Sequence, residues 1–91
     1  MRFEWDENKR RANLHRHGID LADAENVFNG HTVTFEDSRA HYGEQRLVTF
    51  GLLEGRVVAL VHTERDDKIR IISARKASKH EERGYFSQLP D

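Results

Sequence analysis

The stretch that decides the fold is "RLVTFGLLEGRVVALVHTERDDKIRIISAR", which covers residues 46–75. It holds three runs of aliphatic and β-branched residues, separated by the dipeptides Glu54-Gly55 and Asp66-Asp67. Such dipeptides are typical of the tight turns of β-hairpins. We therefore expect three consecutive antiparallel strands, over residues 46–53, 56–64 and 68–75.

The second turn also sets which residues lie opposite each other. A two-residue loop places Arg65 opposite Lys68 and His62 opposite Ile71. Because side chains alternate along a strand, this register puts four polar residues on one face. These residues are His62, Glu64, Ser73 and Arg75, while Arg65 and Lys76 lie on the other face. Cations at strand ends are often merely solvated, so the pattern fits either a solvated edge or a phosphate-binding site.

Shorter signals define the N-terminal part of the chain. The segment "RFEW" (residues 2–5) is a strand candidate, and Asp6 is placed to cap a helix over residues 7–17 that ends at Gly18. Asp20 is placed to cap a second helix. The segment "HTVTFE" (residues 31–36) alternates polar and apolar residues, which predicts a half-buried strand.

A last helix is predicted at the C-terminus. Ser78 and Glu81 have the spacing of a capping box, whereas Gly84 weakens the helix. Its expected anchors are Tyr85, Phe86 and Leu89. The predicted order is β-α-α-β-β-β-β-α, an α+β class in which helices pack on an antiparallel sheet. We expect residues 1–91 to form a single domain.

Composition limits the function classes. The 91 residues include no cysteine, which excludes a disulfide scaffold and a thiolate metal site. No apolar run is long enough for a membrane span, so we expect a cytoplasmic protein. The net charge is −1, but residues 20–44 carry six acidic side chains and one basic, and residues 65–83 carry seven basic and four acidic. This segregation suggests one surface for a polyanion and another for a basic partner.

Two groups of polar residues offer chemistry. Phosphodiester cleavage without a metal needs a base, an acid and cations that stabilise the phosphorane, and residues of the last hairpin fit these roles. On the first helix, Asp6, Lys9, Asn13 and His17 form one polar stripe. Lys9 either contacts a substrate or partner or is simply solvated, and Asn13 is expected at the surface. The histidines lack metal-ligand spacing, so no metal site is expected.

Four segments together resemble a known family. They are "FEWDENKRRANLHRHGI" (residues 3–19), "GEQR" (43–46), "VHTER" (61–65) and "RIISARKASKHEERGY" (70–85). In this order and spacing they resemble the BrnT family of toxins. The resemblance implies a RelE/ParE-like fold and a ribonuclease toxin of a type II toxin–antitoxin system, with RNA as substrate and without a metal or cofactor. It also implies a BrnA-like ribbon-helix-helix antitoxin that brings the complex to operator DNA, with a dimer inside a heterotetramer.

The resemblance also suggests roles for individual residues. Arg75 and Arg65 are expected to bind phosphate and stabilise the transition state, with either Glu64 or His62 as the base. Three further residues are expected to bind RNA: Lys9, Arg46 and Lys76. Two other functions stay open, namely a non-catalytic module that acts in an antitoxin–operator complex and a ParE-like toxin with a protein target such as gyrase.

Overall fold

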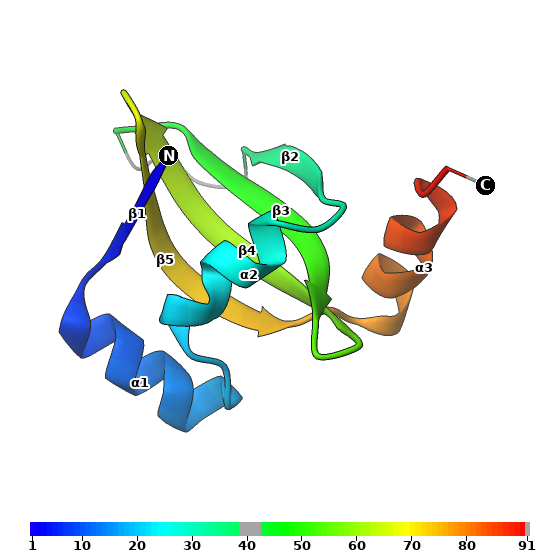
Figure 1. The fold of residues 1–91 in the computed structure, drawn as a ribbon, viewed down its shortest axis with the longest axis horizontal. Helices are drawn as coiled ribbons and strands as arrows, with labels where there is room; N and C mark the ends of the chain where they lie inside the picture. Colours follow the sequence, from blue (N-terminus) through cyan, green and yellow to red (C-terminus); the bar gives the residue numbers. More distant parts are fainter. Residues whose placement is uncertain (39–42, 91) are drawn as a thin grey trace.

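The computed structural model describes residues 1–38 and 43–90, which form a mixed five-stranded sheet with helices (Figure 1). The strand order across the sheet is β1-β5-β4-β3-β2. The elements are β1 (Arg2–Trp5), α1 (Glu7–His17), the 3₁₀ turn η1 (Leu21–Asp23), α2 (Ala24–Phe28), β2 (Val33–Asp37), β3 (Arg46–Leu53), β4 (Arg56–Arg65), β5 (Lys68–Lys76) and α3 (Lys79–Ser87). The α+β class predicted from the sequence is therefore confirmed.

The expectation of a purely antiparallel sheet is wrong. β2, β3, β4 and β5 pair antiparallel, but β1 pairs with β5 in parallel, with Phe3 beside Ile69 and Trp5 beside Ile71. The chain reaches β5 from β1 only after crossing α1 and the rest of the sheet, so no hairpin fixes the direction of β1. Burial of Phe3 and Trp5 against the main core accompanies this pairing.

Local signals in the sequence account for the ends of most elements. The Asp6 carboxylate accepts a hydrogen bond from the backbone N–H of Lys9, and Gly18 ends α1 in the left-handed conformation with φ 70°. The β3–β4 turn has positive φ at both Glu54 and Gly55, as a tight hairpin requires. The capping box of α3 is also present. These predicted boundaries are confirmed.

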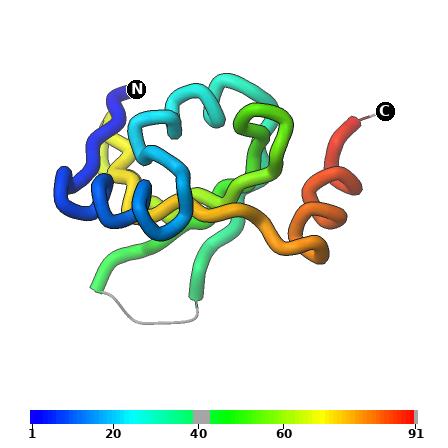
Figure 2. Tube along the Cα trace, turned by 90° about the horizontal axis from the view of Figure 1, so that it is seen from below, coloured from blue at the N-terminus to red at the C-terminus, as the bar shows by residue number. Residues whose placement is uncertain are grey.

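The sheet has two unlike faces. The helix-covered face carries Val58, Leu60 and His62 of β4, and packs against a core supplied by η1, α2 and the segment before them. We call the opposite side the open face. On β4 it carries Val57, Ala59, Val61, Thr63 and Arg65. Figures 1 and 2 show α1 and α2 together, with α3 apart from them at the far end of the molecule.

A β-bulge at Ile72 changes which side chains share a face. Arg65 lies opposite Lys68 and His62 opposite Ile71, as predicted, but the register then shifts so that Val61 lies opposite Ser73. One extra residue in a strand reverses the facing of everything beyond it. The prediction that Ser73 and Arg75 share the face of His62 is therefore wrong.

Beyond the bulge, Arg75 and Lys76 each lie on the opposite face of the sheet from the one predicted. Arg75 lies opposite Ala59 and so shares the open face with Arg65. Lys76 lies opposite Val58, on the helix-covered side. The two arginines that the sequence register separated are thus brought to one face by a single inserted residue.

Asn13 ties α1 to the sheet. Its exposed fraction is 7%, so its expected place at the surface is wrong. Its amide nitrogen donates to the carbonyl oxygens of Ile19 and Ala74, at 2.8 and 2.9 Å, and its oxygen accepts from the N–H of Ala74 at 3.0 Å. β1 pairs with β5 only as far as Ile71. The amide of Asn13 therefore bonds the β5 backbone beyond the end of β1.

α3 rests on one end of the open face. Tyr85 is buried with Phe50, Val57 and Ala59, and its hydroxyl donates to the carbonyl of His31 at 2.8 Å. Leu89 packs beside this cluster, but Phe86 is 47% exposed, so its expected role as an anchor is wrong. None of the helices in the described part of the chain has the length and apolar character that a membrane span needs.

Candidate functional site

The strands of the open face concentrate positive charge. Register places cationic side chains on it from four strands: Arg2 of β1, Arg46 of β3, Arg65 of β4, and Lys68, Arg70 and Arg75 of β5. The acidic strand residues on the same face are Glu4, opposite Arg70, and Asp37, opposite Arg46. The fold therefore collects cations on one surface although the whole chain has a net charge of −1.

Arg65 stands at the rim of a hollow near the β4–β5 turn. The hollow has a volume of about 280 Å³ and is lined by Thr63, Arg65, Lys68 and Arg70, together with acidic side chains that include Glu4. Arg70 lies 3.5 Å from the Glu4 carboxylate in a half-exposed ion pair. Lys68 and Arg70 were not singled out from the sequence, although their i, i+2 spacing on β5 places both on the face of Arg65.

Arg75 is held by a two-point ion pair at the other end of the open face. Its Nη1 and Nη2 lie 2.8 and 3.0 Å from the two carboxylate oxygens of Glu81 in α3. The bonds from Arg75, reinforced by the backbone N–H of Ser78, lower the pKa of Glu81 to about 2. Glu81 therefore has two roles, since it caps α3 and also orients Arg75. Its spacing from Ser78 predicted only the cap.

The two arginines are too far apart for one phosphate. Arg65 and Ala59, which lies opposite Arg75, are six residues apart on β4, or roughly 20 Å at 3.3 Å per residue. Arg46 is opposite Asp37 on β2 and next to Leu47, which pairs with His62. Along the strand direction, Arg46 therefore lies between Arg65 and Arg75. The three guanidinium groups are thus spread along the open face rather than gathered at one point.

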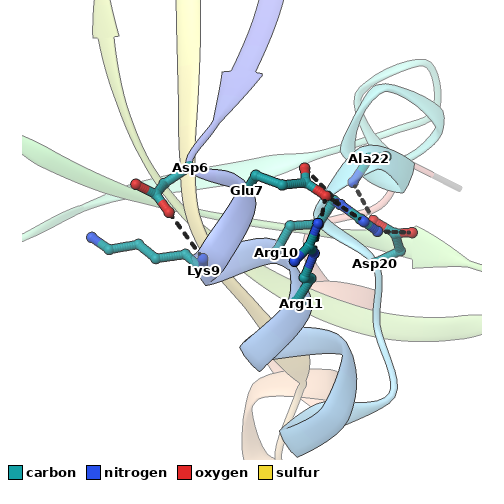
Figure 3. A network of polar contacts seen from close by, with 7 residues as sticks. All are labelled: Asp6, Glu7, Lys9, Arg10, Arg11, Asp20 and Ala22. Atoms are coloured by element: carbon teal, nitrogen blue, oxygen red, sulfur yellow. Dashed lines mark hydrogen bonds and ion pairs between the residues drawn. The ribbon is translucent and has the colours of Figure 1, made fainter.

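Lys9 lies near the bulge but on a different element. It is exposed on α1 and lines a shallow hollow with Ile72 and Ser73 of β5. Figure 3 shows its side chain directed away from the neighbouring ion pairs, in which Arg10 joins Glu7 and Asp20. Those ion pairs fasten α1 to the start of η1 and leave the amine of Lys9 at the surface.

His62 lies inside the core. Its side chain is fully buried, and Nε2 lies 2.7 Å from the hydroxyl of Thr49, which in turn lies 2.8 Å from the hydroxyl of Thr34. Burial lowers the pKa of His62 to about 4, so the ring is neutral near pH 7. A general base must approach the proton that it removes within hydrogen-bonding distance. The position of His62 therefore argues against that role.

The remaining predicted residues are exposed. Glu64 is at the end of β4 on the side of His62, with a carboxylate oxygen 4.0 Å from His62 Nδ1 and 47% of its side chain exposed. Lys76 is exposed at the end of β5. The structure thus brings Arg46, Arg65 and Arg75 to one face, and leaves Glu64 and Lys76 at strand ends that border it.

A family model for "Ribonuclease toxin, BrnT, of type II toxin-antitoxin system" matches residues 5–81. The match spans α1, the sheet from β2 to β5 and the start of α3, and includes the arginines of the open face. The chain belongs to the BrnT family. No curated protein shows a significant match to it.

Membership in the BrnT family indicates which kinds of molecule the protein interacts with. The family description supports ribonuclease activity in general terms, and a type II system implies an antitoxin partner. Arginine suits contact with RNA because its planar fork binds two phosphate oxygens. In this BrnT chain the arginines that meet on the open face come from β3, β4 and β5, far apart in sequence.

Proposed function

We propose that this chain is a metal-independent endoribonuclease toxin whose RNA substrate lies along the open face. The observation that carries the proposal is the β-bulge at Ile72, which turns Arg75 to the face that already carries Arg46 and Arg65. Three strands then present guanidinium groups along roughly 20 Å, the length of a few nucleotides. Salt-sensitive contacts with successive phosphates follow from this arrangement.

The reaction proposed is attack of a ribose 2′-hydroxyl on the adjacent phosphorus. A base removes the hydroxyl proton, the P–O5′ bond breaks, and the leaving oxygen takes a proton, which gives a 2′,3′-cyclic phosphate and a 5′-hydroxyl. Arg65, which neighbours Glu64 at the end of β4, stabilises the charge on the phosphorane oxygens, while Arg46 and Arg75 bind neighbouring phosphates. Of the two base candidates we retain Glu64, because its carboxylate is half-exposed whereas His62 is buried.

Lys9 and Lys76 assist at the margin of this surface. Both are exposed, Lys9 next to the bulge and Lys76 at the end of β5. As surface cations they add attraction for the RNA backbone without contributing to the chemistry.

The proposed partner is a BrnA-like ribbon-helix-helix antitoxin, through which the complex binds operator DNA as a heterotetramer with two toxin chains. The likeness of the sequence segments to BrnT toxins supports this partner. We also propose a RelE/ParE-like relationship, supported by a sheet with helices packed on it. A cytoplasmic location fits the cysteine-free composition.

The test is cleavage of RNA by purified protein in EDTA. Arg65→Ala is expected to lower the cleavage rate by at least about tenfold, because an interaction made in the transition state is removed. Arg56→Ala is the matched control, since Arg56 is an exposed arginine at the other end of the same strand. Glu64→Gln tests the base and is expected to lower the cleavage rate at least about a hundredfold, because general base catalysis typically contributes that much or more.

Other outcomes would support different functions. Loss of cleavage in EDTA with recovery by Mg²⁺ would overturn metal independence. Intact RNA together with inhibition of a topoisomerase would favour a ParE-like toxin. Tight antitoxin binding with no RNA turnover at any protein concentration would favour a non-catalytic module.

A further inference from the structure

An apolar groove lies between α3 and the β2–β3 side of the open face. It has a volume of about 210 Å³ and exposes mostly carbon. Its principal lining residues are Val33, Phe35 and Phe50 on the sheet and Gly84, Tyr85 and Gln88 on or after α3. Phe35 is 55% exposed on edge strand β2, and its ring packs edge-on against Phe50. Neither the family description nor the proposed chemistry uses this groove.

Gly84 gives the groove an unusual wall. It lies within α3 with an ordinary φ, so no special backbone conformation requires glycine. A Cβ atom added there would meet no other atom within 4 Å, so internal packing does not require glycine either. Glycine inside a helix is less favourable than alanine. Gly84 therefore leaves open space at the wall of the groove.

Charge distinguishes the classes of molecule that could enter. A second hollow shares Phe35, Phe50 and Glu81 with the groove and is also lined by Glu36 and Asp37. Carboxylates at this rim repel phosphates but attract lysine or arginine. The arginine that lines the second hollow, Arg75, is already paired with Glu81. A polypeptide with apolar and basic side chains fits this surface better than RNA does.

We propose that the groove between α3 and β2 is a docking site for the antitoxin, which inserts an apolar segment over Phe35 and against Gly84. A basic side chain of that segment meets the carboxylate of Glu36. The inference rests on the proposed function in that it identifies where the partner binds. It also explains neutralisation, because the second hollow leads from the groove to Arg75 and a segment that fills both covers this arginine.

The experiment compares variants of the whole chain with the separately purified antitoxin of the same system. Gly84→Leu places a side chain in the groove; a Cβ there meets no other atom within 4 Å and leucine favours helix over glycine, so we expect the fold to be retained. We expect its Kd for the antitoxin to rise at least about tenfold, as when a central interface contact is lost, with RNA cleavage unchanged. Arg83→Leu, at the next exposed position of α3, is the control and should bind normally. Phe35→Ala gives a second variant that removes an exposed anchor rather than blocking the groove.

Distinct results would overturn the inference. Unchanged antitoxin affinity in both Gly84→Leu and Phe35→Ala would place the interface elsewhere. Slower RNA cleavage with normal antitoxin binding would assign the groove to RNA. A wild-type dimer that Gly84→Leu makes monomeric, with antitoxin affinity unchanged, would assign the groove to a second copy of the chain. An absence of RNA cleavage by the wild type would count against the proposed function alone, because the comparison of antitoxin Kd values does not depend on it.

Discussion

His62 should make the stability of the fold depend on pH. Burial lowers the pKa of its ring to about 4, whereas an unfolded chain presents a histidine of pKa about 6.5. Between these values the unfolded state binds a proton that the folded state does not. Stability is therefore fully present above pH 6.5 and is lost as the pH falls toward 4.

The size of the effect follows from the two pKa values. Over the full window, about 2.5 units at 1.36 kcal/mol per unit give roughly 3 kcal/mol, of which about 2 kcal/mol is lost by pH 5. This is a large share of the 5–15 kcal/mol that typically separates folded from unfolded states. Glu81 loses its own contribution only at lower pH, because its pKa is lowered to about 2. Measurements between pH 5 and 7 therefore isolate the histidine.

The assay is urea unfolding of the wild type and of His62→Gln at several pH values in that range. Glutamine does not titrate and can still hydrogen-bond Thr49, so the variant is expected to lose most of the pH dependence whatever its stability at pH 7. His80→Gln, which changes an exposed histidine, should keep the wild-type dependence. The contrary result is that His62→Gln and the wild type lose the same free energy of unfolding between pH 7 and pH 5. That result would show that the neutral buried imidazole is not the source of the pH dependence.

Three further substitutions test the packing that positions the site. Asn13→Ala should lower the free energy of unfolding by about 2–3 kcal/mol, measured in urea, because it leaves backbone groups of β5 unpaired in the interior. Glu81→Gln keeps capping-box geometry but loses the charge opposite Arg75, so it should cost about 1 kcal/mol at pH 7 and almost nothing near pH 2; an equal cost at both pH values would contradict the ion-pair explanation. Gly51→Ala should lower the melting temperature, since its Cβ would lie 2.6 Å from Cγ1 of Val27 in α2, and overpacking of this kind costs about 1–3 kcal/mol.

Much of the local structure could be predicted because its signals act over a few residues. The caps at Asp6 and Ser78 bond backbone groups within their own first turn, and the turn at Glu54-Gly55 needs only a positive φ at both positions. The pairing of Arg65 with Lys68 follows from the length of the loop between them. These features do not depend on the rest of the fold.

The site was predicted less well, because the side of the sheet or helix on which a side chain lies depends on contacts with residues far away in the sequence. The polar residues His62 and Asn13 look like surface residues in a linear pattern, but each is buried where it finds a specific partner, Thr49 for the ring and Ala74 for the amide. Glu81 could be recognised as part of a cap, but its ion pair with Arg75 exists only once α3 folds back toward β5.

The sequence by itself determined the α+β class, the hairpins, the helix caps and the family, because each is encoded in short motifs or in their order along the chain. Only the tertiary structure decided that β1 runs parallel to β5 and that one extra residue at Ile72 moves Arg75 to the open face. A strand has a side-chain period of two, so a bulge of a single residue reverses every facing beyond it. Just beyond the bulge, the Asn13 amide of α1 bonds the backbone of Ala74, a contact between residues far apart in the sequence that no local signal indicates.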